Sequence, residues 1–284
     1  MCGFAGFLYA DELRSQIENY AVLERMANSM IARGPDDLGV WSSEPGVGLA
    51  HRRLSILDLS KSGHQPMACA FGRYVLVYNG EIYNHITLRK ELERYGPPSA
   101  TERRWRGHSD TETLLASFNL WGIKGTLERC IGMFAFAVWD NKEKVLTLGR
   151  DRLGEKPLYY GWQGQGRAAT FLFGSDLSAL RQHPSFGSQI NRDSLAEYMR
   201  HNCIGGADTI YAGVNKLLPG HLLTVSRRRP EPALSSWWSG ADVAVRGAAV
   251  PFSGSPEDAV LALEGLLRNA VGQQMLADVP SGAF

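Results

Sequence analysis

The second residue of the chain, Cys2, is the sharpest chemical feature of the sequence. A small residue at this position permits removal of Met1, which leaves Cys2 with a free α-amine. The unperturbed pKa of such an amine is about 7.7–8.0, so part of it is neutral near pH 7 and can take the proton of the thiol on the same residue. The resulting thiolate is a strong nucleophile. A buried cysteine at the start of a strand is the alternative, and it is favoured when Cys2 is taken alone.

Two arginines and a short polar run offer groups that suit substrate binding. Arg52 and Arg53 stand beside an apolar stretch, and an arginine on a rigid strand suits bidentate binding of a carboxylate. The run Asn79, Gly80, Glu81 places a carboxamide, an unhindered backbone N–H and a carboxylate in succession, which suits an oxyanion site beside an amine-binding group. The alternatives are a surface arginine pair and a plain hairpin turn, and each is favoured when its motif is taken singly.

Asp110 lies in the first turn of an expected helix. Ser109 and Glu112 have the Ser-x-x-Glu spacing of a capping box, so the helix is expected to begin here and to run to about Trp121. The helix dipole by itself explains an acidic residue at Asp110 without any catalytic role.

The elements that must position these residues follow from apolar periodicity and turn signals. Helices are expected over residues 12–32, 86–95, 176–182 and 192–201. Short strands are expected at residues 3–9, 40–41, 48–50, 54–57, 74–78, 134–139, 144–149, 158–162, 171–174 and 222–225. Asn79-Gly80 between apolar runs is a strong hairpin signal, and residues 140–143 predict a second hairpin turn.

The C-terminal part has a different texture. Residues 226–255 are rich in Arg, Ser, Gly and Pro without periodicity, which predicts a linker. Residues 256–275 form an amphipathic pattern whose apolar face needs a partner. The expected layout is one αβ domain over residues 2–225, a linker over 226–255, and the start of a second domain over 256–284.

Composition excludes several classes of protein. The 284 residues allow roughly two domains or one large β-rich domain, and 44% apolar with 21% charged residues is typical of globular chains. The 30 basic residues nearly balance the 29 acidic ones, which argues against nucleic acid or an anionic membrane as partner. The basic stretches at 102–108 and 226–229 raise an RNA-binding hypothesis, but solvated surface is the favoured interpretation.

The cysteines and the N-terminus indicate the cellular setting. Four scattered cysteines, Cys2, Cys69, Cys130 and Cys203, predict neither a disulfide framework nor a zinc site, so we expect no metal. The N-terminus lacks the pattern of a signal peptide, and no window approaches the roughly 18 apolar residues of a membrane span. We therefore expect a cytoplasmic protein.

Seven motifs occur in the order typical of glutamine-dependent asparagine synthetases. They are MCGFAG (1–6), RGPDD (33–37), HRRLSI (51–56), NGEIYN (79–84), SDTE (109–112), GMFAF (132–136) and RDRLGEKPLY (150–159). Over essentially its whole length the chain resembles the N-terminal class II glutamine amidotransferase domain of that family. The resemblance implies an α+β fold of the N-terminal-nucleophile hydrolase type, with two packed antiparallel sheets in a four-layer αββα arrangement.

The resemblance also implies roles for individual residues. Cys2 would attack the glutamine side-chain amide, form a thioester and release ammonia. Asn79, through its side chain, and Gly80, through its N–H, would stabilise the oxyanion. The glutamine substrate would be bound by a set of residues from three segments: Arg53 for the α-carboxylate, Leu54, Ser55, Ile56 and Leu57 as lining, and Glu81 and Asp110 for the α-ammonium.

The same resemblance sets the expectation for the whole protein. Residues 278–284 resemble the lead into an ATP-binding loop, so the chain is expected to stop just before a synthetase domain that holds ATP and Mg²⁺, while the glutaminase part needs no cofactor. The expected reaction makes asparagine, glutamate, AMP and pyrophosphate from aspartate, glutamine and ATP. Dimers are common in the family, so a homodimer is one expected assembly.

Two alternatives stay open at this point. In one, the chain is a glutaminase subunit for a separate synthetase, or for an amidotransferase acting on another carboxylate, and docks through the helix at 256–275. In the other, it is a catalytically idle interaction module. The full set of site residues argues against the idle module.

Overall fold

The computed structural model describes residues 1–11, 15–43, 46–95, 105–280 and 282. Its body contains two six-stranded sheets whose neighbouring strands are all antiparallel. The first sheet has the order β10 (Asn215–Lys216), β8 (Tyr159–Gln163), β9 (Thr170–Gly174), β1 (Gly3–Tyr9), β3 (Val47–Arg53), β2 (Asp37–Ser43). The second has the order β12 (Arg229–Ser236), β11 (His221–Ser226), β7 (Val145–Arg150), β6 (Gly132–Asp140), β5 (Tyr74–Ile82), β4 (Met67–Ala68).

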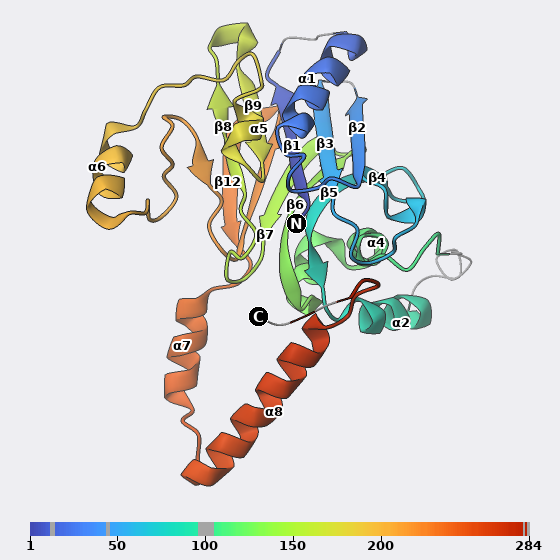
Figure 1. Ribbon diagram of the computed structural model, residues 1–284, viewed down its shortest axis with the longest axis vertical. Helices are drawn as coiled ribbons and strands as arrows, with labels where there is room; N and C mark the ends of the chain where they lie inside the picture. The colour runs from blue at the N-terminus through green and yellow to red at the C-terminus, as the bar shows by residue number, and fades with distance from the viewer. Residues whose placement is uncertain (12–14, 44–45, 96–104, 281, 283–284) are drawn as a thin grey trace.

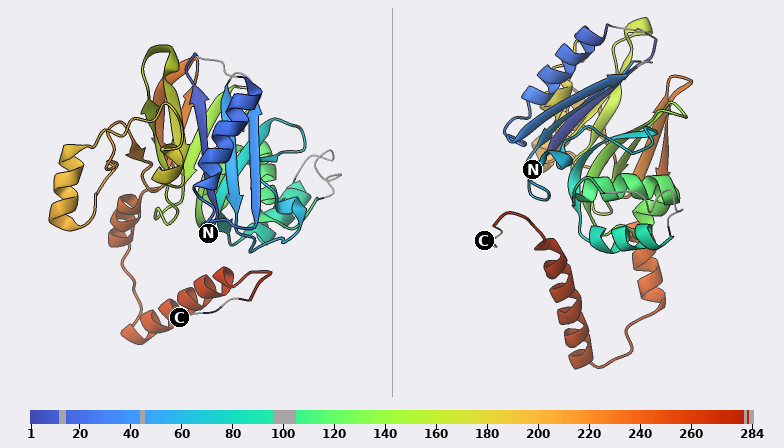
Figure 2. Two further views of the ribbon diagram at one scale, coloured as in Figure 1. Left: turned by 45° about the horizontal axis from the view of Figure 1, so that its top comes forward. Right: turned by 90° about the vertical axis from the view of Figure 1, so that its right-hand side faces the viewer.

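The two sheets pack face to face, and helices cover their outer faces (Figures 1 and 2). Successive side chains of a strand point to opposite faces, so each central strand serves two cores. In β1, Phe4 and Leu8 lie between the sheets, whereas Phe7 packs toward α1 (Gln16–Asn28) and α5 (Leu177–Leu180).

The outer face of the second sheet has the same construction. Phe134 and Phe136 of β6 pack with apolar residues of α2 (His85–Tyr95) and α4 (Asp110–Arg129). The order of layers is helices, sheet, sheet, helices. The predicted four-layer αββα fold with two antiparallel sheets is therefore confirmed.

Most of the predicted elements are present, with shifted ends. Helix α1 begins after Ser15, whose side chain forms a capping box with Glu18, and it is shorter than the predicted 12–32. Helix α6 (Arg192–His201) has the predicted bounds, and α2 begins one residue early. The turn between β6 and β7 is the predicted second hairpin. Short 3-10 helices occupy Lys61–Gly63 and Gly166–Ala168.

The hairpin predicted at Asn79-Gly80 is wrong. Strand β5 runs straight through both residues and pairs with β6, with Asn79 opposite Ala135 and Gly80 opposite Phe134. Glycine is needed here for another reason: a Cβ on Gly80 would overlap the carbonyl oxygen of Met133 and come within 2.7 Å of the Phe134 Cα. The glycine thus marks a close approach of two strands rather than a turn.

Two further predictions near the site need correction. Residues 54–57, predicted as a strand, follow the end of β3 as a loop. Helix α4 begins after Ser109 as predicted and continues past Trp121 through a kink at Gly122, but its capping box does not form. The carboxylate of Glu112 instead accepts hydrogen bonds from the N–H groups of Arg106 and Gly107.

The linker predicted for residues 226–255 is wrong over its first part. Residues 229–236 form β12, which pairs with β11, and Trp237 is buried against the second sheet, stacked on Phe134. Strand β12 lies at the sheet edge, and most of its side chains are exposed. Because exposed side chains need not be apolar, the sequence of β12 shows no alternation of apolar residues. The edge position also tolerates its two prolines, which cannot donate to a neighbouring strand.

Two helices extend from the body at the C-terminal end (Figure 1). Helix α7 (Gly240–Ala249) lies in the predicted linker, and α8 (Pro256–Gln274) occupies the predicted amphipathic segment. The apolar side chains that define the amphipathic pattern of α8, Val260, Leu263, Leu267 and Val271, are more than half exposed.

Candidate active site

A cavity of about 340 Å³ lies where the N-terminus, β5 and α4 meet. Strand β1 brings the N-terminus to the middle of the first sheet, and β5 of the second sheet ends beside it. All predicted site residues except Ser55 line this cavity. The N–H of Ser55 instead donates to Asp36 Oδ2 at 2.7 Å, on the exposed side of the loop.

Cys2 is placed by the pairing of β1 with β3, which sets Gly3 opposite Arg52. Its sulfur accepts a hydrogen bond from the Leu54 N–H at 3.3 Å, and its carbonyl accepts one from Arg33 Nε at 3.2 Å. Burial raises the pKa of the Cys2 thiol, so at neutral pH a nearby base must remove the proton. The amine of Met1 has a lowered pKa, chiefly through burial and also through the charges of Arg33 and Lys156.

Asn79 presents an unpaired donor to the cavity. The residue is 2% exposed, and its Nδ2 is buried with no hydrogen-bond partner in the part of the chain that the structure describes. A buried donor without a partner is costly, which makes Asn79 a candidate for contact with a ligand acceptor. Gly80 follows on the same strand and also lines the cavity.

Two carboxylates face the same cavity from different elements. Asp110 is the first residue of α4 and is buried, and its Oδ2 accepts from the Tyr78 hydroxyl and the Ile82 N–H, each at 2.9 Å. Burial raises the pKa of Asp110 in spite of these bonds. Burial, and then the charge of Asp110, raise the pKa of Glu81. A cation bound between the two would relieve both effects.

The two arginines of the HRRLSI motif point to different places. Arg52 donates to the side chain of Asn28 on α1, whereas Arg53 lines the cavity. The Nη groups of Arg53 donate to the carbonyls of Leu57, Asp58 and Ser60, so Arg53 holds the loop that follows β3. Because a guanidinium has five N–H donors, these contacts leave donors for a substrate carboxylate.

Gln65 and Lys156 are among the lining residues to which the sequence motifs assigned no role. Gln65 is buried, accepts from the Tyr78 N–H at 2.7 Å and donates to Thr111 Oγ1 at 3.4 Å, and so joins β5 to the start of α4. Lys156 is 6% exposed, with its Nζ 3.4 Å from the sulfur of Met1. Its place in the RDRLGEKPLY motif was the available signal, whereas nothing in the sequence marks Gln65.

The remaining hypotheses from the sequence concern metal binding, membrane spans and the two basic stretches. Within the described ranges, no group of three or more His, Cys, Asp or Glu side chains is arranged to hold a metal ion, and no helix has the length and apolarity to cross a membrane. The basic stretch at 102–108 lies partly outside the described residues, and its Arg106 pairs with Glu112. In the other basic stretch, Arg227 donates to the carbonyl of Ala10.

Comparisons with known proteins agree with the fold and the motifs. A family model described as a glutamine amidotransferase domain matches residues 1–238. The chain is 34% identical over its full length to asparagine synthetase [glutamine-hydrolyzing] 3 of Bacillus subtilis and covers 43% of that protein. It is 30% identical over its full length to a putative asparagine synthetase [glutamine-hydrolyzing] 2 of Methanocaldococcus jannaschii and covers 54% of it. The chain thus spans about half the length of these curated relatives.

A solved structure supports the fold independently. The structure of glutamine phosphoribosylpyrophosphate amidotransferase from B. subtilis superposes on 84% of this chain with a TM-score of 0.57 and 17% sequence identity. The match covers 50% of the amidotransferase chain. The family match covers more than half of the chain and reaches past β12. The chain therefore belongs to the glutamine amidotransferase domain family, and it is homologous to the glutaminase part of the glutamine-hydrolysing asparagine synthetases.

Proposed function

We propose that this domain hydrolyses the side-chain amide of glutamine, with Cys2 as the nucleophile. The observation that carries the proposal is the shared cavity: the Cys2 sulfur, the unpaired amide of Asn79 and the carboxylates of Glu81 and Asp110 face one space. These groups match the three needs of the substrate, which are a nucleophile for the amide carbon, a donor for its oxygen and anions for its α-ammonium.

The chemistry begins once Met1 is removed. The freed α-amine of Cys2 takes the proton from Sγ, Sγ bonds to the amide carbon, and the amide oxygen becomes an oxyanion that accepts from Asn79 Nδ2 and the Gly80 N–H. The C–N bond then breaks as the amine returns its proton to the leaving nitrogen. Ammonia departs and a thioester remains, which water hydrolyses to glutamate and the free thiol.

In this proposal the protein binds glutamine through its α-carboxylate and its α-ammonium group. The α-carboxylate pairs with Arg53, and the α-ammonium lies between Glu81 and Asp110, with Leu54, Ile56 and Leu57 as the wall of the cavity. Ser55 is not among the wall residues, so it makes no contact with glutamine in this arrangement.

The test is glutamate release from glutamine by the purified protein. We expect Cys2→Ala to abolish release because it removes the nucleophile. A residue inserted between Met1 and Cys2 should also abolish it, since the α-amine would become an amide. Release by Cys2→Ala at the wild-type rate would contradict the proposal.

A second variant tests the oxyanion assignment. Asn79→Ala should lower kcat by a factor of about 10²–10³ while changing KM little, because the lost hydrogen bond forms in the transition state. Asn119→Ala on α4 is the matched control, since Asn119 bonds the Leu115 carbonyl and does not line the cavity. A kcat for Asn79→Ala within twofold of wild type would contradict the assignment.

We further propose that a synthetase domain in the same polypeptide uses the ammonia, with aspartate as the default acceptor and with ATP and Mg²⁺ bound by that domain. The names and greater length of the curated relatives support this proposal. Formation of asparagine from aspartate, glutamine and ATP by the whole protein tests it, and the absence of aspartate-dependent amide transfer would contradict it. We also propose a cytoplasmic location, where thiols stay reduced.

A separate synthetase subunit is the second candidate for the protein that uses the ammonia, and it would dock on the exposed apolar face of α8. The nucleotide sequence after the codon for Phe284 distinguishes the two. An open frame encoding Ser-Gly-Gly-x-Asp-Ser supports a single polypeptide, and a stop codon beside a synthetase gene supports two chains.

A further inference from the structure

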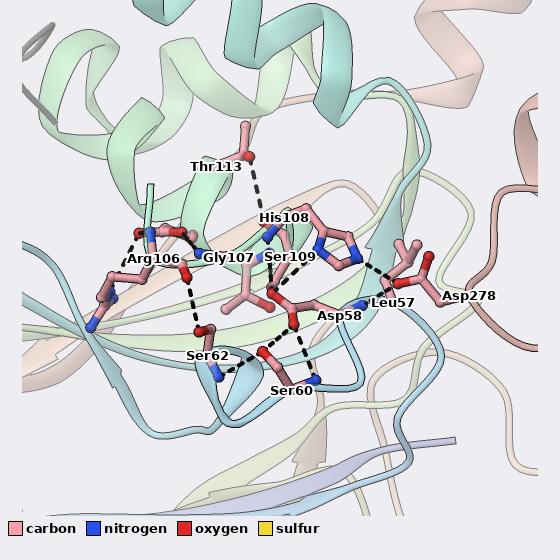
Figure 3. A network of polar contacts seen from close by, with 12 residues as sticks. Leu57, Asp58, Ser60, Ser62, Arg106, Gly107, His108, Ser109, Thr113 and Asp278 are labelled. Carbon is pink, nitrogen blue, oxygen red and sulfur yellow. Dashed lines mark hydrogen bonds and ion pairs between the residues drawn. The ribbon is translucent and has the colours of Figure 1, made fainter. Parts of the chain in front are cut away.

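Asp278 attaches the segment after α8 to two loops of the glutaminase body (Figure 3). Its N–H donates to the carbonyl of Ile56 at 2.9 Å, and its Oδ2 accepts from the Asp58 N–H at 2.7 Å. The same oxygen lies 2.6 Å from His108 Nε2, which donates to it. The bond to His108 is the main cause of a lowered pKa for Asp278, which keeps its carboxylate ionised.

The two loops that Asp278 joins both contribute to the wall of the cavity. Ile56 and Leu57 line it from the loop after β3, and Ser109 and Asp110 line it from the start of α4. His108 directly precedes Ser109, and Asp58 directly follows Leu57. Asp278 therefore bonds to both walls: its N–H bonds the lining residue Ile56, and its carboxylate bonds Asp58 and His108, each one residue from the lining.

A second carboxylate, that of the fully buried Asp58, bonds the same two segments to each other. Asp58 Oδ2 accepts from the His108 N–H at 2.9 Å, and Asp58 Oδ1 accepts from the Ser60 N–H at 3.2 Å. A Cβ on Gly107 would overlap the Asp58 carboxylate, so glycine permits this contact. Asp58 also has a left-handed backbone with φ of 56°, which is uncommon for a residue other than glycine. The Asp58 carboxylate thus holds the loop after β3 against the start of α4. Asp278 bonds to the same loop from the segment after α8.

We propose that Asp278 is a positioning residue for the glutamine site, which holds the 54–58 loop against His108 and links the segment after α8 to the substrate pocket. The inference rests on the proposed glutaminase function. The side chains of Asp278 and His108 are 37% and 62% exposed, so their pairing contributes little to the stability of the whole fold. Its effect falls on the spacing of the two walls, and therefore on the binding of glutamine.

The test is a set of steady-state measurements of glutamate release. Asp278→Ala should raise KM for glutamine about tenfold and leave kcat within about twofold, because misplaced walls weaken binding while Cys2 and Asn79 stay in place. Asp278→Asn should stay within about threefold of wild type, because its amide oxygen can accept both hydrogen bonds. Glu264→Gln is the control, since Glu264 pairs with Arg268 on the exposed surface of α8.

A double-mutant cycle completes the test. His108→Ala should also raise KM, and the double variant should raise it no further than Asp278→Ala alone, because the His108 bond is one of the two side-chain bonds that Asp278→Ala already removes. An unchanged KM in Asp278→Ala, or a lower kcat at unchanged KM, overturns the inference while the glutaminase function stands. If wild type releases no glutamate in a Cys2-dependent way, the proposed function fails and the inference fails with it.

Discussion

At the residue scale, the candidate site depends on polar groups that are buried without full compensation. Asn79 has a buried donor without a partner in the described part of the chain, and burial raises the pKa of both Glu81 and Asp110. Such groups cost folding free energy in the empty protein, and a ligand with complementary charge removes the cost. These groups therefore suit the proposed substrate, which carries an acceptor at one end and a cation at the other.

The raised carboxyl pKa values predict the pH dependence of glutamine use. An ammonium binds the ionised carboxylates, so kcat/KM should fall as the pH drops through the raised pKa values, at a higher pH than ordinary carboxyl groups would give. Asp110→Asn should raise KM about 10- to 100-fold, as expected for a lost charge-assisted contact. It should also move the acid limb to lower pH, because the Asp110 charge raises the pKa of Glu81.

The measurement is kcat/KM for glutamine in wild type and Asp110→Asn across the acid range. The side-chain amide oxygen of this variant can still accept the bonds from Tyr78 and Ile82, so the local structure is retained. An acid limb at the same pH in both proteins would show that Glu81 and Asp110 do not act together on the substrate.

At the element scale, strand β5 brings three site residues to the cavity because it does not turn. Its pairing with β6 extends from Tyr74 to Ile82, so Asn79, Gly80 and Glu81 stand in register with a rigid neighbour. The same pairing leaves no room for a side chain at Gly80. The element that positions the proposed oxyanion donors is thus defined by the close approach of two backbones.

Gly80→Ala should therefore destabilise the fold. The new Cβ would overlap backbone atoms of β6, and overpacking of this kind costs about 1–3 kcal/mol or more. Gly125→Ala in α4 is the matched control, because its Cβ would meet no atom closer than 3.6 Å. It should leave stability unchanged or raise it by up to about 1 kcal/mol. Urea unfolding followed by tryptophan fluorescence measures both, and equal unfolding free energies for the two variants would contradict this account of Gly80.

At the scale of the whole molecule, the site requires the two sheets to stay in contact. Cys2 directly precedes β1 of the first sheet, and Asn79 lies on β5 of the second sheet. The cavity therefore exists only while the two sheets pack together. His51 of β3 joins them directly, with its Nε2 3.0 Å from the carbonyl of Tyr78 on β5. Burial lowers the pKa of His51 from 6.5 to about 4, so the folded protein keeps this histidine neutral.

This pKa predicts acid destabilisation of the fold. The unfolded chain binds a proton at His51 more readily than the folded one, so the stabilisation is complete above about pH 6.5 and is lost as the pH falls toward 4. The loss from His51 is about 3 kcal/mol at most. Burial lowers the pKa of His85 to about 4 as well, so it adds a similar slope.

Urea unfolding at several pH values between about 7.5 and 4.5 tests the prediction. His51→Gln keeps an N–H donor for the Tyr78 carbonyl but does not titrate in this range, so its unfolding free energy should depend less on pH than that of wild type. The same pH dependence in both proteins would show that His51 is not responsible.

Much of the fold and the chemistry could be predicted from the sequence. Apolar periodicity located the central strands and α6, because buried elements must alternate or repeat their apolar residues. It failed for β12, whose exposed edge is held by backbone hydrogen bonds that do not depend on side-chain type. It also failed at Asn79-Gly80, where the same two residues suit a turn and a close contact between strands.

The sequence by itself determined the family, the four-layer fold and the residue types of the site, because motif order and residue chemistry are local properties of the chain. Only the tertiary structure decided which groups share the cavity. It placed Arg53 inside and Arg52 against α1, left Ser55 outside, and added Gln65 and Lys156. It also brought Asp278 to His108, 170 positions away. The physical reason is that such contacts depend on how the sheets and loops pack, and no spacing along the chain records that packing.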